Sequence, residues 1–97
     1  MNLDELSDIL NRLETLRSER DDFALEAARK MATTGVITES AAAETVELLV
    51  RLGERAAEEA LLSELSSEDL RIYAIKAARM AEEIGRVVFG NRLARVR

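Results

Sequence analysis

Apolar residues recur three and four positions apart along nearly the whole chain, which is the spacing of an amphipathic helix. In the first third this stripe is formed by Leu3, Leu6, Leu10, Leu13, Phe23, Ala24, Ala27 and Met31. Such a repeat is typical of a coiled coil or a helical bundle. Asn2 is a suitable N-cap, and Gly35 is a natural left-handed residue after a helix end. The pattern therefore predicts one long helix over residues 3–34.

Two further helices are expected in the remaining chain. The second should begin near Thr38 or Ser40, either of which can cap it, and continue to about Leu65. Small residues occupy its inner positions, and Gly53 among them indicates close packing, a bend, or a break that divides this helix. The third should begin at Ser66 and end at Gly90. Its inner positions are Leu70, Ala74, Ala77, Ala81, Ile84 and Val88.

These elements predict an all-α fold, an antiparallel bundle of three helices, or of four if Gly53 divides the second. We assign residues 1–90 to a single bundle domain and residues 91–97 to a short basic tail. A helix over residues 3–34 would be about 48 Å long, whereas a compact chain of this length is about 32 Å across. Elongation, a kink or a second chain would resolve this mismatch. Ile72 and Ile75 lie off the inner stripe and favour the second chain, so we predict a two-fold homodimer.

Composition removes several classes of chemistry. The 97 residues include no His and no Cys, which excludes a disulfide framework, a thiol nucleophile, a Cys/His zinc site and a Ser–His triad. Adjacent carboxylates, as in Asp21-Asp22 and Glu82-Glu83, point about 100° apart on a helix and do not converge on one ion. No glycines have the spacing of a phosphate-binding loop. We expect no metal and no cofactor.

Charge and hydropathy bear on partners and location. Lys and Arg number 14 against 19 Asp and Glu, a formal net charge of −5. This balance, with few aromatic residues, disfavours nucleic-acid binding. The first residues lack the basic and apolar regions of a signal peptide, and no apolar run is long enough to span a bilayer. We therefore expect a cytoplasmic protein without a membrane span.

Arg20 is the candidate for anion binding. It falls on the inner stripe of the predicted first helix, where a buried guanidinium could bind a carboxylate or phosphate. The alternative, which we favour, is that Arg20 buries its stem and pairs with a neighbouring acid. A second charged run, from Glu47 to Glu58, could likewise form an anion site around Arg51. We interpret that run as a solvated face with i,i+4 ion pairs.

The C-terminal segment differs in charge from the rest of the chain. From Ile84 to Arg97 there are four arginines and no acid, whereas the preceding residues are acidic. Such a segment could dock on an acidic protein partner or fold back on the acidic body of its own dimer. The residues that would make this contact are Arg86, Phe89, Arg92, Leu93, Arg95 and Arg97.

Two functions follow from these observations. The first is a non-catalytic helical interaction module, an adaptor, inhibitor or assembly subunit that acts as a homo-oligomer. The second is a small enzyme, or a scaffold derived from one, that binds a dicarboxylate between subunits. The run from Ser18 to Glu26 resembles the first-helix segment of the all-α chorismate mutases, a resemblance that would make Arg20 an anion ligand. The chain departs from that family's charged positions at Leu3, Met31 and Ala42-Ala43.

Overall fold

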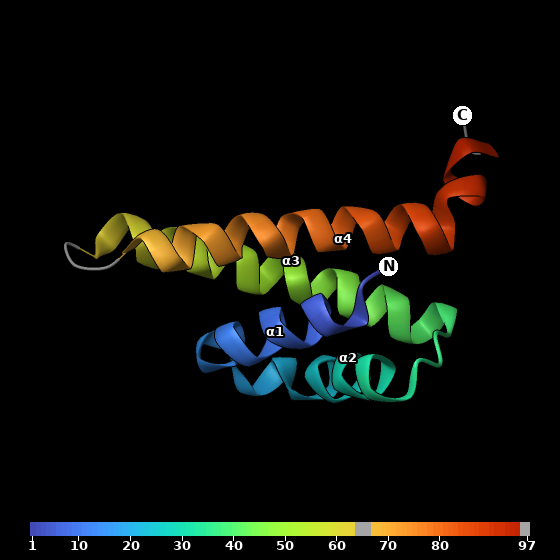
Figure 1. Cartoon of the computed structure of the whole chain (residues 1–97), viewed down its shortest axis with the longest axis horizontal. Helices are drawn as coiled ribbons and strands as arrows, with labels where there is room; N and C mark the ends of the chain where they lie inside the picture. The colour runs from blue at the N-terminus through green and yellow to red at the C-terminus, as the bar shows by residue number, and fades with distance from the viewer. Residues whose placement is uncertain (64–66, 96–97) are drawn as a thin grey trace.

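The computed structural model describes the backbone of residues 1–63 and 67–95 and the side chains of residues 1–63 and 68–90. These ranges are helical and contain no strand, so the predicted all-α class is confirmed. The elements are α1 (Leu3–Leu13), the 3-10 turns η1 (Glu14–Leu16) and η2 (Glu19–Asp21), α2 (Asp22–Thr34), α3 (Glu39–Leu62) and α4 (Ser67–Arg95). Four α-helices pack together: α3 lies along α4 and against α2, and α1 packs on α2 and reaches α4 (Figure 1).

Most of the predicted helix ends are found where local chemistry favours them. The Asn2 side chain accepts a hydrogen bond of 3.1 Å from the Glu5 backbone N–H. Thr38 does the same for the Ala41 N–H at 3.0 Å and opens α3. Gly35 closes α2 with φ of +74° and donates its N–H to the Met31 carbonyl at 2.9 Å. Only glycine adopts this left-handed conformation at no steric cost, which explains its position there.

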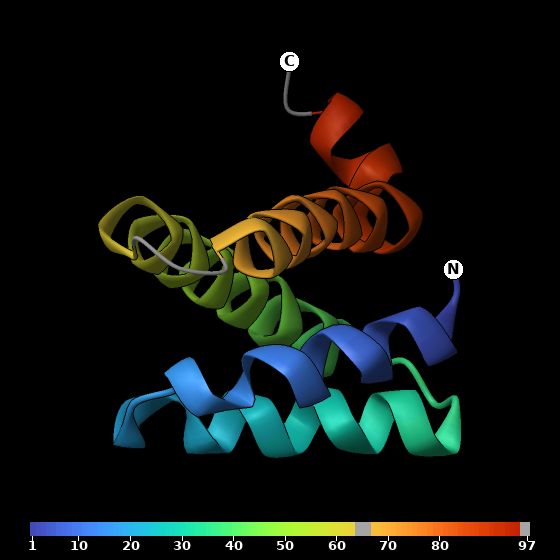
Figure 2. The ribbon, with the colours of Figure 1, turned by 60° about the vertical axis from the view of Figure 1, so that its left-hand side comes forward.

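The long first helix predicted over residues 3–34 is wrong. The chain leaves the helix after Leu13, makes two 3-10 turns and re-enters a helix at Asp22. Between the turns Arg17 and Ser18 are extended, with ψ of 152° and 170°. This break folds α2 back beside α1 (Figure 2). Both helices can then turn their apolar stripes toward α3 and α4, which a straight helix could not do within one chain.

The second and third helices differ less from expectation. α3 is continuous through Gly53, so Gly53 does not divide it. A Cβ at Gly53 would lie 3.4 Å from the Ala77 Cβ and 3.5 Å from the Ala74 carbonyl oxygen. Of the three interpretations, close packing is therefore the one observed. α4 continues past Gly90 to Arg95, and its last turns bend away from the main axis (Figure 2).

The core lies where α1 and α2 meet α3 and α4. It includes the fully buried side chains of Leu6, Ile9, Leu10, Leu13, Leu48, Leu49, Leu52 and Ile84. Polar contacts join α1 to α4 at its rim, where the Tyr73 hydroxyl donates to Asp8 at 2.7 Å. The molecule measures 44 × 30 × 24 Å. Its long dimension follows α3 and α4. The mismatch between helix length and the size of a compact chain is thus resolved by an elongated shape together with the break in the first helical region.

Candidate functional site

Asp21 is the only charged residue with a buried side chain among the residues that the structure describes, and it lies at the break between α1 and α2. Its carboxylate accepts hydrogen bonds from the Ser18 backbone N–H at 2.9 Å and from the Ser18 hydroxyl at 3.1 Å. The first of these contacts belongs to a capping box over residues 18–21, in which the Asp21 side chain accepts from the backbone N–H of Ser18. The local sequence thus aims the carboxylate inward, because capping fixes both the turn and the side chain.

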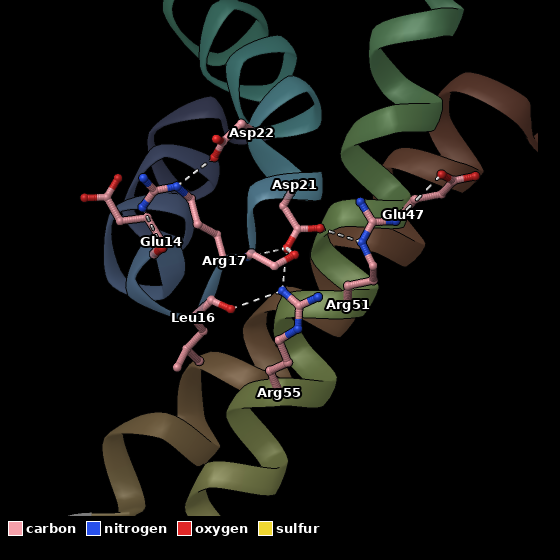
Figure 3. Close-up of polar contacts among 9 residues, drawn as sticks. Glu14, Leu16, Arg17, Asp21, Asp22, Glu47, Arg51 and Arg55 are labelled. Carbon is pink, nitrogen blue, oxygen red and sulfur yellow. Dashed lines mark hydrogen bonds and ion pairs between the residues drawn. The ribbon is translucent and has the colours of Figure 1, made fainter.

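Two arginines of α3 reach this carboxylate (Figure 3). The Arg51 Nε donates to Asp21 at 2.9 Å, and Arg55 donates to the other carboxylate oxygen. Arg55 also donates to the Leu16 backbone carbonyl at 3.1 Å. We refer to Ser18, Asp21, Arg51 and Arg55 as the Asp21 cluster. It ties the break in the first helical region to the middle of α3.

The electrostatics of the cluster keep Asp21 ionised. Burial by itself raises the pKa of Asp21. Hydrogen bonds from Arg55, from the Ser18 backbone, from Arg51 and from the Ser18 hydroxyl act against it and together lower the pKa well below its usual range. A carboxylate held ionised in this way is a poor general acid or base near neutral pH. The arrangement suits a structural brace better than proton transfer.

The charges around the cluster leave little room for an anion. Arg51 and Arg55 border a surface hollow of about 340 Å³, but Glu54 and Glu58 line the same hollow. Glu47 lies 3.9 Å from Arg51 on the solvent side. Both arginines are already paired with Asp21. The interpretation of residues 47–58 as a solvated face with i,i+4 ion pairs holds for Glu47 and Arg51, but it missed that Arg51 and Arg55, each 30% exposed, pair with the buried Asp21.

A second feature is an apolar groove between α3 and α4, with a volume of about 500 Å³. We call it the α3–α4 groove. Its lining comes from these two helices and consists of Leu49, Val50, Gly53, Glu54, Ala57, Ala74, Ile75, Ala78 and Glu82. Val50 is 44% exposed and Ile75 is 52% exposed. Small residues make the groove wide enough to receive side chains from outside, while Glu54 and Glu82 supply its polar atoms.

Arg20 does not lie where the sequence pattern placed it. It belongs to η2, and its side chain is exposed. The inner position predicted for it is wrong, because the extended residues before η2 rotate the chain and turn Asp21 inward instead. Arg20 makes no ion pair with any residue that the structure describes. Its role as an anion ligand stays a prediction.

The C-terminal candidates are only partly within the described residues. Arg86 is exposed, and Phe89 is half-buried and packs against the core. The side chains of Arg92, Leu93 and Arg95, and the whole of Arg97, lie outside the described residues. α4 brings the backbone of residues 91–95 into a helical turn, so their spacing is that of a helix rather than of an extended tail.

Sequence reasoning missed Asp21, although a signal was present. The pattern Ser18-Glu19-Arg20-Asp21 matches a capping box, which marks a helix start and argues against a helix running through it. The apolar stripe on both sides of the break masked this signal. The convergence of Arg51 and Arg55 on Asp21 could not be read from the sequence, since it depends on how α3 packs against the break.

Comparisons with protein-family models, with curated proteins and with solved structures found no match to this chain. The resemblance to the all-α chorismate mutases rests on the residues quoted above alone. None of the helices in the described ranges is both long and apolar enough to cross a bilayer.

Proposed function

We propose that this protein is a non-catalytic helical interaction module that acts as a homo-oligomer, with the α3–α4 groove as its contact surface. The observation that carries the proposal is the apolar groove itself. Its volume is about 500 Å³, and its lining is largely aliphatic. Large exposed apolar patches on folded proteins commonly mark sites of protein association.

The polar chemistry of the chain supports the same conclusion. The buried carboxylate of Asp21 stays ionised, and its charge is balanced by Arg51 and Arg55. These three residues are used in joining helices to one another. In contrast, Val50 and Ile75 are left partly in water at the groove, where burial against another protein would be favourable.

We propose a second copy of the chain as the occupant. α3 has 24 residues and spans about 36 Å. Two helices packed side by side are about 20 Å wide, so this face offers about 700 Å². A stable protein interface buries about 800 Å² on each partner. The groove and its margins are thus of the size that a specific homodimer needs.

The basic C-terminal segment is the second interaction element that we propose. Arg86, with Arg92, Arg95 and Arg97 further along, would dock on an acidic protein partner, which fits an adaptor, inhibitor or assembly subunit. A cytoplasmic location is kept as a prediction.

Light scattering after size exclusion, at two protein and two salt concentrations, tests the oligomeric state. We expect the mass of a dimer throughout for the natural protein. Val50→Glu should shift it to monomer, because a carboxylate in the apolar contact would lose its hydration. Val87→Glu is the matched control, since Val87 is also a helical valine, is 59% exposed and lies outside the groove. A monomer at all concentrations would overturn the proposal.

A further inference from the structure

The two copies can meet through the α3–α4 groove in two ways, and the charges distinguish them. We infer that α3 of each copy packs antiparallel over α4 of the other, with the two-fold axis parallel to the helices. The acidic outer side of α3 then meets the basic outer side of the partner's α4. This inference rests on the proposed function, and it specifies the partner surface that the groove receives.

The geometry of a two-fold contact limits the choices. A face made of two antiparallel helices can be rotated about an axis parallel to the helices, which places α3 over the partner's α4. It can also be rotated about an axis across the helices in the plane of the contact, which places α3 over the partner's α3. Both are isologous, so each residue contact occurs twice. Like charges facing each other across such a contact are unfavourable.

The outer side of α3 is acidic. Glu47, Glu54 and Glu58 are all exposed and are spaced seven and four residues apart, so they share one side of the helix. The two nearby arginines, Arg51 and Arg55, are turned toward Asp21. An arrangement with α3 over α3 would bring this acidic side against itself. It is therefore the less favourable of the two.

The outer side of α4 carries more basic than acidic residues. Arg71, Arg79 and Arg86 are exposed, against the acids Glu68 and Glu82. None of the three arginines makes an ion pair with a residue that the structure describes, and neither Glu54 nor Glu58 does. Unpaired charges of opposite sign thus flank the two sides of one apolar groove. A partner rotated about the helical direction brings Arg71 and Arg79 toward Glu54 and Glu58.

The levels of Glu54 and Glu58 along the helices agree with this arrangement, whereas Glu47 comes level with the partner's Glu82. Rotation about an axis parallel to the helices leaves each residue at its own level. Gly53 lies beside Ala74 and Ala77, which fixes the level of α3 relative to α4. Because α3 and α4 run in opposite directions, five residues forward from Gly53 on α3 reach the same height along the bundle as about five residues back on α4. Glu58 therefore lies near the height of Arg71. Glu54 comes between Arg71 and Arg79, within about one helical turn of each.

Apolar residues would fill the middle of the contact. Val50 and Ala57 of α3 would face Ile75 and Ala78 of the partner's α4. Small side chains at these positions allow helix axes to approach closely. Leu61 is 84% exposed and lies four residues after Ala57 on the same side of α3. The arrangement therefore also covers this exposed leucine.

A charge-reversal experiment tests the pairing. One variant carries Glu54→Arg and Glu58→Arg, and the other carries Arg71→Glu and Arg79→Glu. Each alone should dimerise about tenfold or more weakly than the natural protein, because two pairs on each of two symmetric contacts become repulsive. An equal mixture should form a heterodimer close to natural affinity, since both contacts then pair opposite charges. Native mass spectrometry with one variant extended by a tag separates heterodimer from homodimers.

The controls keep the outcomes distinct. Glu26→Arg and Lys30→Glu, exposed residues of α2 away from the groove, should leave dimerisation unchanged. Circular dichroism confirms that each variant folds. If Glu54→Arg with Glu58→Arg dimerises like the natural protein, α3 faces α3 and the inference is overturned while the proposed function stands. Two weakened variants that do not form a heterodimer overturn it as well. A natural protein that is monomeric overturns the inference together with the proposed function.

Discussion

Replacing Asp21 with Asn tests whether the Asp21 cluster holds the break between α1 and α2 against α3. The amide keeps an oxygen for the Ser18 N–H but removes the charge that Arg51 and Arg55 pair with. Breaking a fully buried ion pair by removing one partner costs about 3–5 kcal/mol. Because the two arginine side chains are each 30% exposed and can be rehydrated, we expect a loss of about 2–3 kcal/mol. For a chain of this size the Tm should fall by about 10 °C or more.

The matched control is the neighbouring residue. Asp22 is paired with Arg17 at 2.9 Å, but its side chain is 61% exposed. Such surface pairs contribute little, so Asp22→Asn should change the free energy of unfolding by about 0.5 kcal/mol or less. Urea unfolding followed by circular dichroism, at one protein concentration, gives both values. Equal losses for the two variants would refute the view that Asp21 braces the break.

The pH dependence of the same measurement has a definite sign. The pKa of Asp21 is lowered on folding from its ordinary value of 3.8. Its contribution to stability is therefore present above the unfolded pKa and is lost as the pH falls toward the folded pKa. The difference between the natural protein and Asp21→Asn should be full at about pH 7 and clearly smaller at about pH 3. The other carboxylates are present in both proteins, so their contributions cancel in the difference between the two free energies of unfolding. A difference independent of pH would contradict the assigned cause.

Three further substitutions follow from backbone geometry and exposure. Gly35→Ala should destabilise the protein by about 1 kcal/mol, because a φ of +74° is strained for a residue with a Cβ. Nothing lies within 4 Å of the added methyl group, so the backbone strain acts alone. Gly85→Ala should stabilise the protein by up to about 1 kcal/mol, since Gly85 is helical and has equal space; thermal unfolding measures both, and shifts of the same sign would contradict the argument. Arg20→Leu should change stability by about 0.5 kcal/mol or less and leave dimerisation intact. Calorimetry with succinate checks the alternative, because a dicarboxylate that binds the natural protein and not Arg20→Leu would support an anion site instead.

Several features of the fold were predictable because they are local. Asn2, Thr38 and Gly35 act through hydrogen bonds or dihedral angles within four residues of themselves, and the structure has them in the expected places. The break at Glu14–Asp21 was also encoded locally, in the capping box of Ser18 and Asp21. The apolar repeat on both sides gave the opposite indication. Two local signals conflicted, and packing against α3 decided between them.

The candidate site was less predictable, because each part depends on helices meeting at particular levels. Arg51 and Arg55 look like surface residues of α3 when the sequence is read alone. They become partners of a buried carboxylate only when the break lies against the middle of α3. Likewise, Val50 and Ile75 have no common role in the sequence, and the packing of α3 on α4 places them in one groove.

The sequence by itself determined the helical class, the main helix caps and the absence of His and Cys chemistry, since these follow from residue type and near-neighbour spacing. Tertiary structure decided that Asp21 meets Arg51 and Arg55, that Gly53 marks a close approach of two helices, and that an apolar groove stays open. The physical reason is the same in each case. Burial and ion pairing depend on distances between segments far apart in the chain, and the packing of the helices sets those distances.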